Sequence, residues 1–188
     1  MLEKEYRPLW LMSLVTLFGF PLLAWPLMWY QDISWSSIFH LSKKVWFYLP
    51  LSLSLGIFFG LIMIYLTELQ FFDKALSSIR NRLKNIKLTT FFVVTLSICA
   101  GVGEEIFFRA ALQPLLGVWL TSLIFVSIHG YFSLKNSWLN LFGLLLFLFI
   151  VFIGWLAKEY SLWIAILAHF SYDLVLLFYY KKEQQAPF

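Results

Sequence analysis

Apolar runs long enough to cross a bilayer dominate this chain. A membrane-spanning helix needs about 20 mainly apolar residues. The runs show no period-two alternation, so helices rather than barrel strands must satisfy the backbone in lipid. Five runs approach the required length, namely Pro8 to Tyr30, Val45 to Leu66, Leu88 to Leu116, Trp138 to Ala157 and Leu162 to Tyr180, and a sixth, Val118 to His129, is short but unbroken. The sequence therefore predicts an all-α polytopic membrane protein, a bundle of about six transmembrane helices.

Composition supports a single integral membrane domain over residues 1–188. The chain is 61% hydrophobic, against about half in soluble domains, and no polar block is long enough to fold separately. The formal charge of +4 comes from basic residues between the apolar runs. Membrane orientation and anionic lipid account for them there, so no nucleic acid partner is expected. The lone cysteine, Cys99, excludes an internal disulfide and a cysteine metal cluster.

Lysine and arginine residues outside the apolar runs are unevenly distributed. Most lie before the first run, in residues 67–87, in residues 131–137 and after the last run, whereas the alternate loops contain Lys43, Lys44 and Lys158. Because cytoplasmic loops are enriched in basic residues, both termini are predicted to be cytoplasmic. The compact chain and this bias suit a bacterial inner membrane.

Two segments between the runs are expected to lie at the membrane surface. The segment "DISWSSIFHLSKK" is typical of an interface, and its His40 is expected to have no functional role. Residues 67–87 are predicted to form an amphipathic connector helix on the inner surface, because apolar residues recur on one stripe. The same spacing also allows a coiled-coil seam, so a homodimer is an alternative. The stripe consists of Leu69, Phe72, Leu76, Ile79, Leu83 and Ile86, with Lys74, Arg80, Arg82, Lys84 and Lys87 mostly off it.

Three ionisable residues interrupt the apolar stretch "GVGEEIFFRAAL" at residues 101–112. Charged groups at bilayer depth cost at least about 2.5 kcal/mol each, so they face the bundle interior and usually mark function. Helical spacing lets Glu105 pair with Arg109, whereas Glu104 points about 100° away. An unpaired carboxylate in a poorly hydrated site is a stronger base, so Glu104 is the candidate general base. A purely structural salt network is the alternative, and the glycines allow a bend before the glutamates.

Two further apolar runs also carry ionisable residues. His129 ends "FVSIH", four residues after Phe125, and His169 begins "HFSYD", four residues before Asp173. Each pair shares one face of its helix. A single buried histidine is usually a packing residue, but three helices with such groups are hard to explain by packing. If the faces converge, Glu104, His129, His169 and Asp173 can activate a water and stabilise an oxyanion, which is the chemistry of hydrolysis.

These motifs resemble those of a known family. "EEIFFR" fits E-E-x-x-x-R, "FVSIH" fits F-x-x-x-H and "HFSYD" fits H-x-x-x-[N/D], in the order found in the CPBP intramembrane proteases. That family includes the type II CAAX prenyl endopeptidases and the Abi-type bacteriocin-processing and immunity-associated proteins. The resemblance covers residues 101–173. It implies that Glu104 and His129 deprotonate the attacking water, and that His169 and Asp173 hold the oxyanion.

The resemblance also implies supporting residues, and it shows one departure. Glu105 and Arg109 would support the site structurally, and Phe125 belongs to the second motif. The better-characterised relatives have asparagine where this chain has Asp173, and an ionised aspartate cannot donate a hydrogen bond to an oxyanion. Either Asp173 is protonated, or it orients His169 instead.

The resemblance favours a metal-free, glutamic-type endopeptidase that needs no cofactor. Its partners would be the lipid bilayer and a peptide or protein substrate that is lipid-modified or membrane-anchored. One alternative is a zinc-dependent endopeptidase with Glu104, His129 and His169 as ligands, although an H-E-x-x-H signature is absent. A non-catalytic membrane scaffold or bacteriocin immunity factor is a second. A proton-coupled transporter is a third, which the lack of an inverted repeat disfavours.

Overall fold

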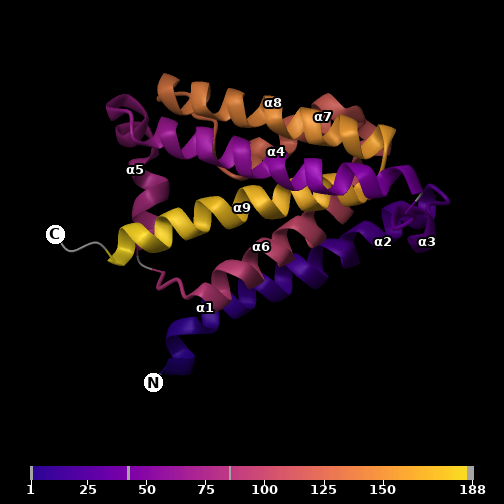
Figure 1. Cartoon of the computed structure of the whole chain (residues 1–188), viewed down its shortest axis with the longest axis horizontal. Helices are drawn as coiled ribbons and strands as arrows, with labels where there is room; N and C mark the ends of the chain where they lie inside the picture. Colours follow the sequence, from indigo (N-terminus) through magenta and orange to yellow (C-terminus); the bar gives the residue numbers. More distant parts are fainter. Residues whose placement is uncertain (1, 42, 85, 186–188) are drawn as a thin grey trace.

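The structure is a helical bundle in which elements lie side by side along one long axis (Figure 1). It is a computed structural model that describes residues 2–41, 43–84 and 86–185, and no strand occurs in this part of the chain. The predicted all-α membrane bundle is confirmed. In chain order, with η marking a π-helical segment, the elements are α1 (Leu2–Leu14), η1 (Val15–Gly19), α2 (Phe20–Tyr30), α3 (Trp35–Ile38), α4 (Lys43–Thr67), α5 (Gln70–Lys84), α6 (Thr90–Glu105), η2 (Ile106–Leu112), α7 (Gln113–Ile128), α8 (Ser137–Glu159) and α9 (Leu162–Gln185).

Five helical segments of the described chain are long and apolar enough to cross a membrane. Four of them coincide closely with predicted runs. The remaining one joins α6, η2 and α7, which the sequence divides into a long run and a short one. The five segments are Tyr6–Tyr30, Val45–Thr67, Thr90–Ile128, Ser137–Glu159 and Leu162–Gln185.

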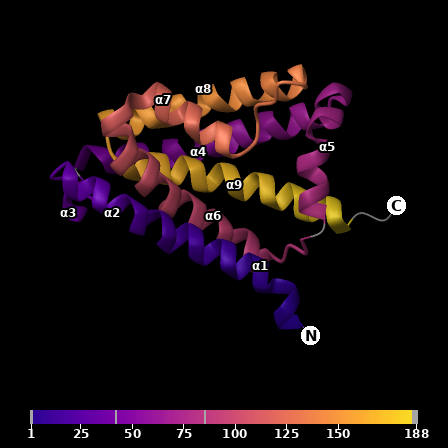
Figure 2. The ribbon, with the colours of Figure 1, turned by 180° about the vertical axis from the view of Figure 1, so that it is seen from behind.

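The longest segment folds back on itself at Gly117. The backbone there has φ 77° and ψ 166°, a conformation that residues with a side chain rarely adopt. The chain reverses, so that α7 packs against η2 and α8 (Figure 2). From Gly117 to Ile128 the helix rises about 16 Å, which is roughly half of the hydrocarbon core. The predicted sixth run, Val118 to His129, is therefore a half-length returning helix that ends inside the bundle.

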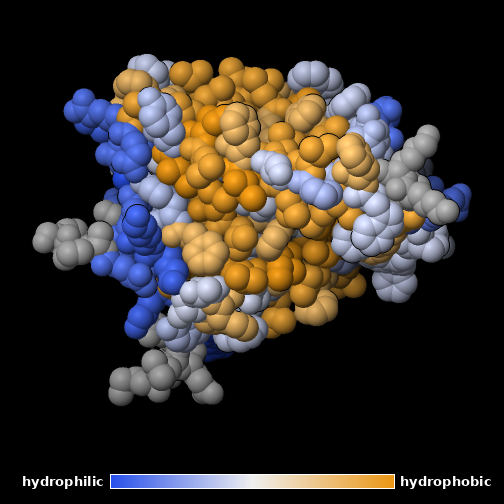
Figure 3. All heavy atoms as spheres, viewed as in Figure 1, coloured by the Kyte–Doolittle hydropathy of each residue, from blue (hydrophilic) through white to orange (hydrophobic). Residues whose placement is uncertain are grey.

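Both chain ends and α5 lie at one end of the bundle, and α3 lies at the other (Figure 1). On the face shown in Figure 3, the larger group of strongly hydrophilic residues lies at the end that carries α5, next to a broad hydrophobic band, and a smaller group lies at the opposite end. This arrangement agrees with the expectation that both termini share one side, while their cytoplasmic assignment stays a prediction. The side chains of Lys4, Lys43 and Lys44, which entered that prediction, lie outside the described residues.

The predicted connector is helix α5, which lies across the end of the bundle (Figure 1). Its Phe72 and Leu76 are buried, and α5 packs against α8 and α4. On its polar side, Arg80 pairs with Asp73 at 2.7 Å and with Glu183 of α9 at 3.7 Å. The amphipathic pattern did not predict this link to α9. The side chains of Arg82, Leu83 and Lys84 lie outside the described residues.

Helix α4 packs closely along α9, the helix that carries His169. At Gly56 of α4, a methyl group would overlap the backbone oxygen of Ala168 and the Oγ of Ser171. The Ser171 hydroxyl also donates a hydrogen bond to the carbonyl of Leu53 at 3.0 Å. The absence of a side chain at Gly56 therefore lets α4 hold α9 in place directly beside His169.

Replacing Gly56 with alanine is expected to lower the free energy of unfolding by about 1–3 kcal/mol, because overpacking forces well-packed neighbours apart. Equilibrium unfolding in mixed micelles measures this change. Gly19→Ala is the matched control, since its added methyl would lie 3.6 Å from Cγ1 of Val15, an ordinary contact. Equal stability of the two variants would contradict the close α4–α9 packing.

Candidate active site

Glu104 lies in the last turn of α6 and is buried. Its Oε2 lies 3.5 Å from Nε2 of His129, yet it has no hydrogen-bond partner among the residues that the structure describes. Buried polar atoms in folded proteins are nearly always hydrogen-bonded, so an unpaired one needs an explanation such as a bound water. As the helical spacing predicts, Glu104 is not the carboxylate that pairs with Arg109.

Helix α6 reaches this position through close packing against the first span. Regular α-helix continues through Gly101 and Gly103, so the bend that these glycines allow does not interrupt α6 before the glutamates. Instead, a methyl group at Gly103 would overlap the backbone oxygen of Thr16 in η1. The helical geometry changes only after Glu105, where η2 begins. Such π-helical turns often occur at functional sites.

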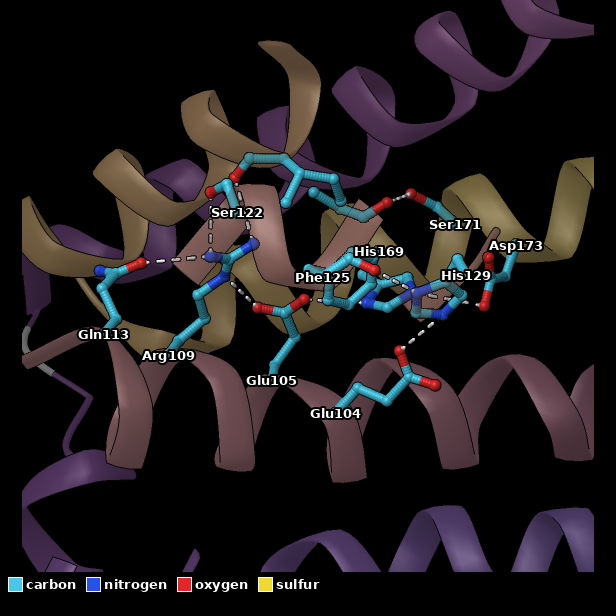
Figure 4. A network of polar contacts seen from close by, with 12 residues as sticks. Glu104, Glu105, Arg109, Gln113, Ser122, Phe125, His129, His169, Ser171 and Asp173 are labelled. Carbon is cyan, nitrogen blue, oxygen red and sulfur yellow. Dashed lines mark hydrogen bonds and ion pairs between the residues drawn. The ribbon is translucent and has the colours of Figure 1, made fainter. Parts of the chain in front are cut away.

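His129 follows the last residue of α7, which points it at Glu104 (Figure 4). Its Nδ1 lies 2.6 Å from the carbonyl oxygen of Phe125. Because a carbonyl can only accept, Nδ1 must carry a proton, and Nε2 is the nitrogen that faces Glu104. The Phe125 ring stacks on the imidazole with centroids 4.4 Å apart. The spacing of four residues in the second motif therefore fixes both the tautomer and the ring plane of His129.

His169 lies on α9 between two carboxylates. Its Nδ1 is 2.8 Å from Oε1 of Glu105, and its Nε2 is 3.5 Å from Oδ2 of Asp173. The shorter contact is an ordinary hydrogen-bond length, while the longer one is not. The sequence allows Asp173 either to be protonated or to orient His169. The structure favours the first of these, because Glu105 already holds the imidazole ring.

Glu105 joins this histidine to a buried cation. Its side chain is fully buried, and its Oε2 accepts a hydrogen bond from Nε of Arg109 at 3.0 Å. The ion pair expected from the spacing is present. The other Arg109 nitrogens donate to Oε1 of Gln113 at 3.2 Å and to the carbonyl of Ile150 in α8 at 3.1 Å. Glu105 and Arg109 therefore link His169 to helix α8.

Sequence reasoning missed two members of this network. Gln113 follows Arg109 by four residues, so the same helical spacing that indicated the ion pair also contained this contact. Its Nε2 donates to the carbonyl of Gly154 in α8 at 2.9 Å. Ser122 of α7, whose Oγ lies 3.4 Å from Nη1 of Arg109, has no pattern that could have revealed it. Its contact depends on the reversal at Gly117.

The structure brings together all four predicted site residues from three helices (Figure 4). Their exposure divides the site into two halves. The side chains of His129 and Asp173 are 34% and 23% exposed, whereas those of Glu105 and His169 are 0% and 6% exposed. A substrate can therefore approach along the edge formed by Glu104, His129 and Asp173, with Glu105 closed off behind His169.

The zinc alternative names Glu104, His129 and His169 as ligands. Nε2 of His129 faces Glu104, whereas Nδ1 of His169 bonds Glu105 and its Nε2 faces Asp173. Over the described ranges, no group of three or more His, Cys, Asp or Glu side chains is arranged to hold a metal ion.

Comparison with known proteins gives one match. Residues 86–175 match the family described as Type II CAAX prenyl endopeptidase Rce1-like. No curated protein and no solved structure matched significantly. The matched segment contains all three motifs, from Glu104 to Asp173, so the resemblance predicted from those motifs is confirmed. At the coarse level the match supports an integral membrane protease of the CAAX type.

Proposed function

We propose that this protein is an intramembrane endopeptidase that hydrolyses a peptide bond with a water activated by Glu104 and His129. The observation that carries the proposal is the buried, unpaired Oε2 of Glu104, which lies 3.5 Å from Nε2 of His129. One water can lie between these two atoms and form a hydrogen bond of about 2.8 Å with each of them. The family match of the surrounding segment supports the same chemistry.

The reaction follows from the roles that the contacts allow. Glu104 takes a proton from the water as its oxygen attacks the scissile carbonyl carbon, and His129 keeps that water aligned through Nε2. The carbonyl oxygen becomes an oxyanion as the new C–O bond forms. The C–N bond then breaks, and the proton held by Glu104 passes to the leaving amine. Water is thus divided between the new carboxyl group and the new amine.

In the proposed mechanism, the oxyanion lies beside His169 and Asp173. His169 as imidazolium donates from Nε2, because its Nδ1 is held by Glu105. Asp173 lies beside that nitrogen and is partly exposed, so its protonated form supplies a second donor. Donors that are fixed before reaction stabilise developing charge strongly in a poorly hydrated site. This assignment gives Asp173 the role that asparagine has in the relatives.

The proposed substrates are peptides that reach the site from the bilayer, either with a lipid-modified C-terminus or with a hydrophobic anchor. The name of the matched family, with its prenyl endopeptidases, supports the first class. We further propose a bacterial inner membrane location with both termini cytoplasmic, as the distribution of basic residues predicts. The alternative scaffold and transporter functions have no specific contact in the site that favours them.

Cleavage by the purified protein tests the proposal. Protein in lipid vesicles is incubated with prenylated and unmodified hydrophobic peptides in isotopically labelled water, and the products are identified by mass spectrometry. Hydrolysis places the label in the new carboxyl group. Absence of cleavage together with proton-driven solute flux in the same vesicles would favour the transporter instead.

The same assay distinguishes metal-free from zinc-dependent hydrolysis. Treatment with a strong zinc chelator, followed by its removal, is expected to leave the cleavage rate unchanged within about twofold, because the proposed mechanism activates the water with Glu104 and His129 and uses no metal. Elemental analysis of the purified protein gives a second readout. Loss of activity that added zinc restores would contradict the metal-free mechanism.

A further inference from the structure

A second cavity lies at the end of the bundle opposite α5, away from Glu104 and His129. It has a volume of about 520 Å³, which lies in the usual size range for small-molecule sites. Its walls come from the segment around α3, from η2 with the start of α7, and from the turn between α8 and α9. These elements meet at the α3 end of the bundle (Figure 1).

The polar lining of this cavity is cationic or neutral. Lys158 and His40 line it, together with Ser37 and Ser161, and the inner wall is formed by Arg109. No aspartate or glutamate is among the described lining residues. Glu159, the next residue after Lys158, does not line this cavity; both residues line a neighbouring one. An anion in this cavity would therefore meet positive charge and hydroxyl donors without a competing carboxylate on the lining.

Two of these groups lack a partner among the described residues. In the part of the chain that the structure describes, neither the side chain of Lys158 nor that of His40 forms a hydrogen bond or ion pair. Arg109, by contrast, already donates hydrogen bonds to Glu105, Gln113, Ser122 and Ile150. Lys158 and His40 are thus available to bind a ligand, while Arg109 forms a fixed part of the cavity wall.

The rest of the lining is apolar, and the surroundings are typical of a membrane interface. Ile33, Ile38 and Leu162 are among the apolar residues that line the cavity. Large aromatic side chains are exposed around this end, as in the aromatic belts of membrane proteins. They are Trp29, Tyr30, Trp35, Trp155 and Tyr160. The cavity therefore combines cationic groups with apolar walls at the depth where lipid headgroups lie.

From this combination we infer that the cavity binds the phosphate headgroup of an anionic phospholipid, with Lys158 and His40 contacting the phosphate and the apolar walls contacting the glycerol and upper acyl chains. A free phosphate would leave the apolar walls without contact. An acidic peptide would not explain the aromatic surroundings. The site is independent of the proposed hydrolysis, because its two unpaired groups lie outside the Glu104 and His129 site.

The test is lipid binding by native mass spectrometry of the purified protein in micelles, titrated with phosphatidylglycerol or phosphatidylcholine. Wild-type protein is expected to bind phosphatidylglycerol preferentially. Lys158→Gln is expected to weaken this binding about fivefold, as expected for one cation near a lipid phosphate. His40→Gln is expected to weaken it as well, because it removes the second proposed contact with the phosphate. Lys135→Gln removes the same charge at the α5 end and is expected to have no effect.

Four outcomes would overturn the inference. Equal binding of both lipids would show that the cavity does not select an anionic headgroup. Unchanged binding by both variants would show the same. Binding of inorganic phosphate with the same affinity and the same sensitivity to Lys158→Gln would assign the cavity to a free anion. Displacement of lipid by an acidic peptide at lower concentration would assign it to a peptide. Should Lys158→Gln fail to fold, His40→Gln alone decides between these results.

Discussion

Replacing Glu104 with glutamine is expected to lower kcat/KM for peptide cleavage by about three orders of magnitude, which lies within the range for loss of a general base. Glutamine keeps the shape of the side chain but cannot accept the proton of the attacking water. Little stability should be lost, because Oε2 of Glu104 has no hydrogen-bond partner among the described residues. Initial cleavage rates and unfolding midpoints of the same preparation measure both effects.

The matched control is Glu159→Gln, which makes the same chemical change on an exposed residue at the end of α8. It should cleave at the wild-type rate. A fully active Glu104→Gln protein would exclude Glu104 as the base. If the chain is a non-catalytic scaffold, Glu104→Gln should also preserve its function in cells, so complementation separates that alternative from a protease.

Contacts within one helix were predictable from residue spacing alone. The pairing of Glu105 with Arg109 and the separate direction of Glu104 follow from helical periodicity, and both are present. The bond from His129 to the carbonyl of Phe125 has the same origin. Apolar run lengths likewise predict the membrane bundle, since the bilayer sets the length of each span.

Contacts between helices were not predictable in this way. Nothing in the spacing indicates that Glu105 of α6 receives a hydrogen bond from His169 of α9, because that contact depends on how two distant helices pack. The path of α7 is a second example. A short apolar run is compatible with a thin span or a returning half-helix, and only the backbone of Gly117 decides between them.

The site also combines two kinds of carboxylate that look alike in the sequence. Glu104 and Glu105 are adjacent and both buried, yet Oε2 of Glu104 has no hydrogen-bond partner among the described residues, whereas Glu105 is held between a cation and a histidine. The first arrangement suits proton transfer, and the second suits fixing a neighbouring ring. Their consequences on replacement should therefore differ in kind, with the loss in Glu104 variants confined to rate.

Replacing Glu105 with leucine is expected to lower the free energy of unfolding by about 3–5 kcal/mol, because the change leaves the Arg109 guanidinium buried without its counter-ion. Arg109 is only 4% exposed, so most of its guanidinium is shielded from water. Peptide cleavage should be lost as well, since Nδ1 of His169 would have no acceptor to hold the ring. Equilibrium unfolding in mixed micelles and cleavage rates measure the two effects.

The double variant Glu105→Leu with Arg109→Met separates stability from positioning. Removing both charges leaves no unpaired buried ion, and such replacements are often neutral or stabilising, so most of the lost stability should return. Cleavage should remain at least about 100-fold below wild type, because His169 still lacks its acceptor, and kcat rather than KM should carry the loss. A stable double variant with wild-type activity would reduce Glu105 to a packing role. If the double variant is as unstable as Glu105→Leu, the lost free energy of unfolding does not come from an unpaired Arg109. The loss would then come from His169 or from the space that leucine leaves unfilled.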